Sequence, residues 1–232
     1  MTLEARNVVA GYGDKSVLEQ VSFTLRDGEI LAFFGHNGAG KSTTLKAMVG
    51  LIPVRDGEIL LDGERIDGLP IADRLDRGIR LLPERRGVFP DLSVADNIEI
   101  VARRNCPREG SKITRDDIYD LLPVLASLRP VVAGELSGGQ QQILAFALTL
   151  LGSPRCILLE EPSVGLQPDL VEQLFGKIRD VCATLAVSAI LIEHRIASAM
   201  KIADHVMIIN SGRLVFRGSR AEAERINLWN YF

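Results

Sequence analysis

A glycine-rich stretch, GHNGAGKST at residues 35–43, constrains the fold more than any other part of this 232-residue chain. It follows the apolar run GEILAFF, which predicts a buried strand, and it precedes TLKAMVG, which predicts a helix. Glycines permit the tight turn by which a strand leads directly into a helix. The order of strand, glycine loop and helix therefore predicts an α/β protein with a phosphate-binding turn.

The side chains of this loop are those that phosphate binding requires. Backbone N–H groups of the loop are expected to surround the β-phosphate of a nucleotide, and the amino end of the following helix adds positive potential. Lys41 is expected to bridge the β- and γ-phosphate oxygens, and the Ser42 hydroxyl is expected to bind Mg²⁺. The predicted nucleotide-binding residues of the loop are Gly35, Asn37, Gly38, Ala39, Gly40, Lys41, Ser42 and Thr43.

The remaining pattern alternates strands with helices. EARNVVAGY and VSFTLRDGEILAFFG predict an early antiparallel hairpin, and the short apolar runs in RCILLEEP and SAILIEH predict parallel strands covered on both faces. Between about 91 and 151 the strand pattern gives way to helical patterns. We predict an α/β P-loop NTPase core with a mixed sheet and an N-terminal antiparallel β region, built from residues 1–90 and 152–232, and an inserted helical subdomain at 91–151.

Composition excludes several classes of protein. The net charge is −3, without the basic excess of a nucleic-acid binder, so no nucleic-acid partner is predicted. No apolar run approaches the roughly 18 residues that span a membrane, which predicts a cytoplasmic chain. Cys106, Cys156 and Cys182 lack CxxC spacing, and the apolar runs around the last two predict buried, reduced thiols.

A second motif, LSGGQQQ at 136–142, selects among the many proteins with such a loop. Ser137 and Gln140 have the spacing of a capping box, whereas Gly138 and Gly139 weaken a helix and are suited to close approach of an anion. Together with the P-loop, this stretch resembles the signature of ABC ATPases. The resemblance implies that Ser137, Gly138, Gly139 and Gln140 contact the γ-phosphate of an ATP held by a partner subunit.

The resemblance covers essentially the whole chain and assigns further residues. It implies that Tyr12 stacks on adenine and that His194, in LIEHRI, is the switch histidine. Glu84 stands where most of the family has a glutamine, and it is expected to contact the nucleotide and the metal. The stretches LLPERRGVFPDLSVADNI and SVGLQP resemble the branch that imports branched-chain amino acids.

Two adjacent acids end the run CILLEEP at 156–162. Successive strand side chains point to opposite faces, so both acids cannot face one ligand unless the chain turns there. The resemblance implies that Glu160 helps to hold Mg²⁺ and that Glu161 polarises the attacking water. Glu160 replaces the aspartate of the family, and Leu148 replaces an arginine, so a weakly hydrolysing or regulatory cassette is an alternative.

The resulting interpretation is an ATPase that forms a dimer around two ATP molecules. Its expected partners are a second ABC ATPase subunit, transmembrane permease subunits on the inner face of the cell membrane and, indirectly, a substrate-binding protein. Importers of urea or other amides are alternatives, as is a soluble ABC protein, although a single cassette without long coiled coils disfavours the latter. A P-loop GTPase or small kinase is disfavoured because NKxD is absent. The C-terminal INLWNYF is interpreted as a packing tail rather than a subunit contact.

Overall fold

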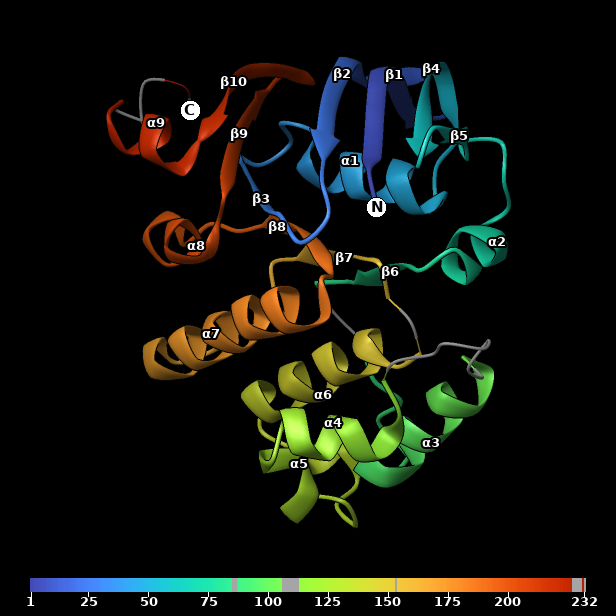
Figure 1. Cartoon of the computed structure of the whole chain (residues 1–232), viewed down its shortest axis with the longest axis vertical. Coiled ribbons are helices and arrows are strands. Elements are labelled where there is room, and N and C mark those ends of the chain that lie inside the picture. Colours follow the sequence, from blue (N-terminus) through green and yellow to red (C-terminus); the bar gives the residue numbers. More distant parts are fainter. Residues whose placement is uncertain (85–86, 106–112, 153, 227–230, 232) are drawn as a thin grey trace.

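The larger sheet has six strands in the order β10-β9-β3-β8-β7-β6 (Figure 1). The computed structural model describes residues 1–84, 87–105, 113–152, 154–226 and 231. Neighbouring strands of this sheet are parallel except for β10, which runs antiparallel to β9, so the predicted mixed sheet is confirmed. The strands are β3 (Ile30–Phe34), β6 (Ile79–Leu82), β7 (Cys156–Glu160), β8 (Ser188–Ile192), β9 (His205–Asn210) and β10 (Arg213–Ser219).

A second sheet has four antiparallel strands in the order β2-β1-β4-β5, and it lies at the top of the view in Figure 1. Its first two strands form the predicted hairpin. Sequence reasoning did not anticipate that a later segment returns to pair with β1 on its other side. The strands are β1 (Leu3–Tyr12), β2 (Lys15–Leu25), β4 (Val54–Leu61) and β5 (Glu64–Arg65).

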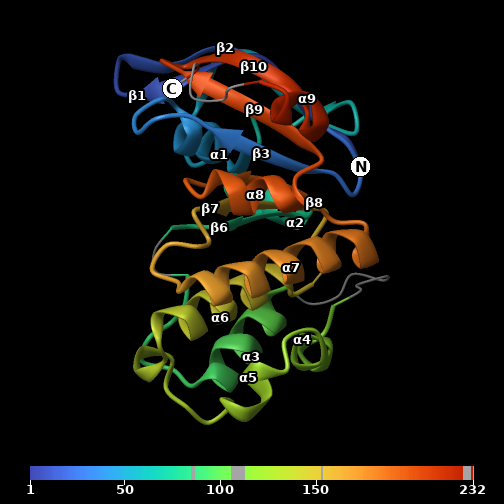
Figure 2. The same cartoon turned by 90° about the vertical axis from the view of Figure 1, so that its left-hand side faces the viewer.

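Two apolar clusters cover the opposite faces of the six-stranded sheet. Leu31 and Phe33 face one cluster, which includes α1 (Lys41–Val49) and the antiparallel sheet. Ile30, Ala32 and Phe34 face the other cluster, which includes the helices on the far side. All residues of β3, β7 and β8 are buried, as expected for parallel strands with helices on both faces. The helix that follows the glycine loop therefore lies between the two sheets (Figure 2).

The predicted helical region packs below the sheet, next to α7 (Figures 1 and 2). Within the described residues, the chain between β6 and β7 contains helices and no strand of either sheet. The boundaries at 91 and 151 stay a prediction. The remaining helices are α2 (Ile71–Asp76), α3 (Val94–Arg104), α4 (Arg115–Leu121), α5 (Val124–Ser127), a 3-10 turn (Ala133–Glu135), α6 (Gly138–Leu150), α7 (Pro168–Leu185), α8 (Ile196–Ile202) and α9 (Arg220–Glu224).

A buried arginine fixes the far end of α1. The Arg74 guanidinium, on α2, donates to the carbonyl oxygens of Ala47 at 2.8 Å and Met48 at 3.0 Å. The last carbonyls of a helix lack partners within the helix and carry its negative dipole end, so a cation is favoured there. Burial lowers the pKa of Arg74, and the nearby Asp67 carboxylate raises it. Arg74 thus holds the helix that carries the glycine loop in place.

Several sequence-based expectations about the rest of the chain can be compared with the structure. Cys156 and Cys182 are buried free thiols, as predicted, and Cys106 lies outside the described residues. No helix in the described part of the chain has both the length and the apolar character to cross a membrane. Of the aromatic tail, the Tyr231 ring packs 5.8 Å from the Phe216 ring, whereas 227–230 and 232 lie outside the described residues.

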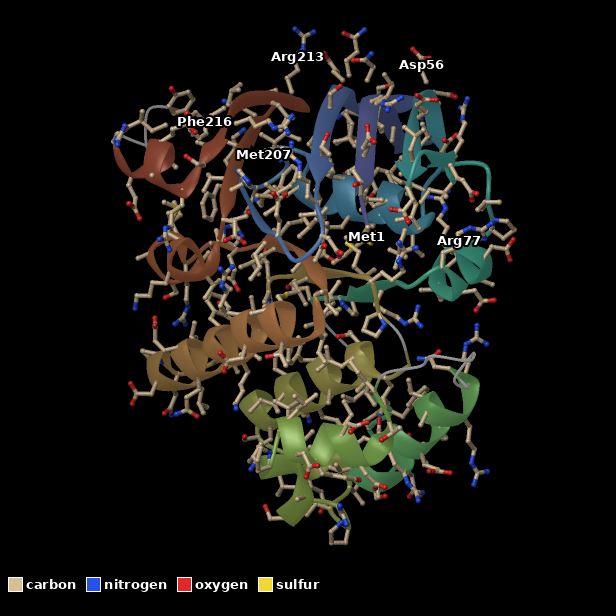
Figure 3. All side chains as sticks on the ribbon, in the orientation of Figure 1. Met1, Asp56, Arg77, Met207, Arg213 and Phe216 are labelled. Atoms are coloured by element: carbon tan, nitrogen blue, oxygen red, sulfur yellow. The ribbon has the colours of Figure 1, made fainter. Side chains whose placement is uncertain are left out.

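Most charged side chains lie at the surface of the molecule, and apolar side chains fill its interior. Arg213 and Asp56 project outward at the upper edge of the molecule, and Met207 lies inside it (Figure 3). Met207 is 1% exposed. Arg213 forms an ion pair with Glu19 of β2, which ties the edge of the six-stranded sheet to the antiparallel sheet.

Candidate active site

Most of the predicted site residues gather at one edge of the six-stranded sheet. The glycine loop follows β3, His194 follows β8, Glu161 follows β7, and Glu84 follows β6. These strands are parallel neighbours in the order β3-β8-β7-β6, so their carboxyl ends meet at the same edge. Ligands of open α/β sheets bind outside this edge.

The glycine loop has a conformation that larger residues would disrupt. Gly40 has φ of 116°, and a Cβ there would lie 2.9 Å from the Leu18 side chain. A Cβ on Gly35, at φ of 150°, would lie 2.3 Å from the carbonyl oxygen of Ile209. The tight turn predicted from the sequence is therefore confirmed, and Gly35 and Gly40 are required by close packing as well as by φ.

The amino end of α1 has no cap from a side chain. Its N-cap is Gly40, which provides no side-chain hydrogen bond, and the first turn has no acidic residue. By contrast, Ser93, Thr114 and Ser219 cap α3, α4 and α9 with their side chains. The first N–H groups of α1 and its positive dipole end are therefore available to an anion.

The Lys41 ammonium lies over this loop. Its Nζ donates to the carbonyl oxygens of Gly35 at 2.6 Å and His36 at 3.1 Å, and the residue is 5% exposed. Burial lowers the pKa of Lys41, and the negative charge of Glu161 raises it. A buried cation next to an uncapped helix end is suited to a phosphate group, whose oxygens can replace the two carbonyls as acceptors.

The two adjacent acids have different surroundings. β7 ends at Glu160, and Glu161 has φ of 48°, so the chain turns between them. The Glu161 carboxylate lies 2.8 Å from Nε2 of His194. Glu160 is 7% exposed, and no hydrogen-bond donor of the described residues contacts its carboxylate. The predicted catalytic pair is thus in contact, and Glu160 is a separate buried carboxylate.

Two further residues predicted to contact the nucleotide, Tyr12 and Glu84, are less buried than Lys41. Tyr12 is the last residue of β1 and is 48% exposed, so its ring is not part of the core. Arg55 of β4 holds the turn after Tyr12 by donating to the carbonyl oxygens of Gly13 and Asp14. Glu84 is partly buried, and the arginines at 85 and 86 lie outside the described residues.

The second motif forms the predicted capping box at the start of α6. Ser137 Oγ accepts a hydrogen bond from the Gln140 N–H, and the Ser137 N–H donates to Gln140 Oε1 at 3.0 Å. A Cβ on Gly139 would lie 3.0 Å from Leu170, whereas one on Gly138 would meet nothing within 4 Å. Packing within the chain explains Gly139, and Gly138 leaves the helix end open.

One chain does not bring its two motifs together. The apolar residues of α1 belong to one face of the six-stranded sheet, and those of α6 belong to the other face. The helix capped by Ser137 therefore packs on the opposite face of the sheet from the helix that follows the glycine loop.

Sequence reasoning missed Glu193, which directly follows β8 and is 3% exposed. Its signal was present, because LIEH places an acid at the end of a buried strand just as CILLEE does. Glu193 accepts hydrogen bonds from the loop that follows Glu161.

Comparison with known proteins identifies the family. A profile described as "ABC transporter" matches residues 18–164, which include the glycine loop, the LSGGQ motif and the paired acids. The chain belongs to the ABC transporter family. It is an ABC-type ATPase, an ATP-binding subunit of a transporter, as the sequence predicted.

Relatives of this cassette serve different transporters. It is 35% identical to "Probable branched-chain amino acid transport ATP-binding protein LivF" of Archaeoglobus fulgidus, over 92% of this chain and 90% of that protein. It is 31% identical to "Lipopolysaccharide export system ATP-binding protein LptB" of Escherichia coli, over 95% and 92% of the two chains. A crystal structure of the ADP conformation of MJ1267, an ATP-binding cassette of an ABC transporter, superposes with a TM-score of 0.85 over 97% of this chain and 94% of that one, at 23% identity. The predicted fold is thereby confirmed.

Proposed function

We propose that this cassette hydrolyses ATP to drive import of branched-chain or related amino acids through a membrane permease. The observation that carries the hydrolytic part is the contact between Glu161 and His194, which lies at the same sheet edge as the glycine loop. The likeness to LivF supports the substrate class. The likeness to LptB favours a lipopolysaccharide exporter as the second candidate.

The side chains at this edge can divide the work of hydrolysis. The amino end of α1 and Lys41 bind and orient the phosphates, and Tyr12 stacks on the base. Glu161 orients a water molecule and accepts its proton as the water attacks the γ-phosphate. His194, at 2.8 Å from Glu161, holds that carboxylate in place and contacts the γ-phosphate. Glu84 follows the neighbouring strand, and we propose that it contacts the same phosphate.

The residues at this edge fit a Mg²⁺ ion. Among the described residues no group of three or more His, Cys, Asp or Glu side chains could hold a metal, so we propose that phosphate and water supply the ligands that the protein does not. That is the usual habit of Mg²⁺ in nucleotide sites. Glu160, buried without a donor from the described chain, is the carboxylate that a cation would neutralise. Ser42, Glu160 and Glu84 would hold the ion, which when bound neutralises the charge that develops on the phosphate.

We expect Glu160→Asp to lower the Mg²⁺ concentration for half-maximal ATPase activity or to raise the maximal rate. The backbone beside Glu160 is fixed, because the next N–H donates to the carbonyl of Ile192 at 2.9 Å. Mg²⁺ requires ligands at about 2.0 to 2.1 Å, so the side chain must absorb an extra bond of about 1.5 Å by an unfavourable rotamer. Glu160→Ala should impair both quantities. A Mg²⁺ titration in which Glu160→Asp equals or falls below the parent would show that the site has adapted to glutamate.

The arrangement of motifs supports a dimer. The helices that follow the glycine loop and the LSGGQ motif pack on opposite faces of the sheet, which supports an arrangement in which a second cassette supplies the motif to each ATP. ATP binding would close this dimer and hydrolysis would reopen it.

An apolar groove between α2, β6 and α6 supports a permease contact on the inner face of the membrane. Leu75, Leu82 and Ala145 line it, together with Leu148 and the 48%-exposed Phe89. Leu148, where the family usually has arginine, adds to the apolar part of the lining, and the lining also includes the side chains of Arg80 and Arg104. We propose that a permease segment docks here, so that motion near Glu84 reaches the membrane.

Transport measurements test this proposal. The cassette is co-expressed with the permease and binding-protein genes that neighbour its own gene, in cells that lack their own uptake of leucine and urea. Uptake of labelled leucine and valine, lost in Glu161→Gln, is the expected result. Uptake of urea alone would move the substrate to the amide importers. Neighbouring genes for a lipopolysaccharide exporter, with no uptake of these labels, would overturn import.

A further inference from the structure

A buried carboxylate joins the two loops that carry the catalytic pair. Glu193 Oε1 accepts from the Ser163 N–H at 2.9 Å, and Oε2 accepts from the Ser163 hydroxyl at 2.9 Å. Oε2 also accepts from the N–H groups of His194 at 3.1 Å and Arg195 at 3.4 Å. With 3% of its surface exposed, Glu193 has these four protein donors in place of water.

The bonds of Glu193 connect the turn after Glu161 to the backbone of the switch-histidine loop. Ser163 lies two residues after Glu161, and Glu193 lies next to His194. A parallel contact reinforces the link, because the Arg195 guanidinium donates to the Leu166 carbonyl at 3.0 Å. The separation of Nε2 of His194 from Glu161, 2.8 Å, thus depends on how the two loops are held together.

We propose that Glu193 is a positioning residue for ATP hydrolysis, which clamps the turn after Glu161 to the loop of His194 and so keeps this pair in contact. The inference rests on the roles of Glu161 and His194 given under the proposed function. The four hydrogen bonds that Glu193 accepts all come from the two loops. Its role is to set the relative position of Glu161 and His194, which act on the nucleotide.

The chemistry of the site requires a carboxylate of this length. Both oxygens of a carboxylate only accept hydrogen bonds, and here both of them face N–H or O–H donors. A glutamine has the same shape, but its NH₂ group is a donor. In either orientation this group would face a donor of Ser163 or of His194, so the hydrogen bonds to one of the two loops would be lost. An aspartate keeps the charge but is shorter by one bond of about 1.5 Å, so it cannot span both loops.

The matched control is Glu172→Gln. Glu172 on α7 also bridges to the segment after the switch histidine, because it accepts from Ser198 at 2.9 Å and Lys201 at 2.7 Å. It is exposed and lies outside the catalytic edge. The control makes the same chemical change between nearby elements without touching the clamp.

The first measurement is steady-state ATPase activity of the purified full chain. Glu193→Gln is expected to lower kcat by about 10- to 100-fold, because small misplacements of catalytic groups have effects of this size. The KM for ATP should change by less than about threefold, since the glycine loop and Lys41 are untouched. Glu172→Gln should leave kcat and KM within about twofold of the parent, as expected of a surface change. A kcat for Glu193→Gln within threefold of the parent overturns the inference.

A double-mutant cycle separates positioning from a general structural role. If Glu193 acts through His194, adding Glu193→Gln to His194→Ala should lower kcat by less than about twofold more. If the kcat loss of the double variant instead equals the product of the two single losses, the inference is overturned. Glu161→Gln and His194→Ala alone test the roles on which the inference rests. If Glu161→Gln and His194→Ala keep the kcat of the parent, the proposed roles of Glu161 and His194 are wrong. If both variants lose turnover but Glu193→Gln keeps the kcat of the parent, only the proposed role of Glu193 is wrong.

Nuclear magnetic resonance of the histidine rings tests the clamp even in a variant with no measurable turnover or with a low melting temperature. The chain has three histidines, so their ring ¹⁵N resonances can be assigned individually. Glu193→Gln should move those of His194 and leave those of His36 and His205 unchanged. Should this variant fail to fold, Ser163→Ala, which removes only the hydroxyl contact, should shift the same resonances of His194. Unmoved resonances of His194 in a folded variant contradict the clamp.

Discussion

Glu161→Gln is expected to abolish ATP turnover while the protein keeps its ATP. The amide preserves the shape of the side chain but cannot accept the proton of the attacking water. General-base catalysis contributes about 10²- to 10⁴-fold, so phosphate release under saturating ATP and Mg²⁺ should fall by that factor. The uncapped end of α1 and the Lys41 ammonium are unchanged, so nucleotide binding measured by calorimetry should stay within about threefold of the parent, since no phosphate contact is removed.

The same variant tests the dimer. With hydrolysis blocked, the closed state should accumulate, and light scattering should report a mass near twice that of the 25.4 kDa chain. The matched control is Glu224→Gln, which changes an exposed acid on α9. This variant should hydrolyse ATP at the rate of the parent, and its dimer should reopen. A monomer in saturating ATP and Mg²⁺ would contradict the sandwich of two cassettes. Full turnover in Glu161→Gln would instead contradict the assignment of the base.

The parts of this structure that the sequence predicts are set by local chemistry. The turn at Gly35 and Gly40 has φ values of 150° and 116°, which favour glycine, and this preference is set within a few residues. The capping box of Ser137 and Gln140 spans three residues and forms as expected. Apolar runs predict buried parallel strands, and the end of each strand then places the following polar residue at the ligand-binding edge.

The parts that the sequence does not reveal depend on residues far apart in the chain. Glu193 meets Ser163 across thirty positions, and Arg74 reaches Ala47 across 27 positions. Neither pairing has a fixed spacing that could be recognised without the fold. The return of β4 to the early hairpin is likewise a matter of strand order, which periodicity does not determine.

The paired acids Glu160 and Glu161 combine a feature that the sequence predicts with one that only the structure reveals. The period of a strand correctly separates Glu160 from Glu161, but only the left-handed φ of Glu161, 48°, shows how the chain turns to present the second acid to His194. Residues other than glycine rarely adopt this conformation, and it is found where surrounding contacts enforce it. Here the Glu161 N–H donates to the Ile192 carbonyl at 2.9 Å, which anchors the turn.

Lys41→Ala is expected to lower the affinity for ATP by about 100-fold, because it removes two charge-assisted hydrogen bonds of about 1.5 kcal/mol each. In the structure this ammonium donates to the carbonyl oxygens of Gly35 and His36. These acceptors are exchanged for phosphate oxygens on binding, and the alanine variant has nothing to exchange. Calorimetric titration with ATP and Mg²⁺ measures the loss directly.

Two further variants decide whether charge or position is responsible. Lys46→Ala removes the same charge from the last turn of the same helix and should bind ATP within about threefold of the parent, because helix charges act mainly within their own turn. Lys41→Arg keeps the charge but replaces a compact ammonium with a planar fork, which the buried space over Gly35 cannot align with both phosphates. Its affinity should therefore stay nearer to that of the alanine variant. Unchanged affinity in Lys41→Ala would refute the assignment of the glycine loop as the nucleotide site.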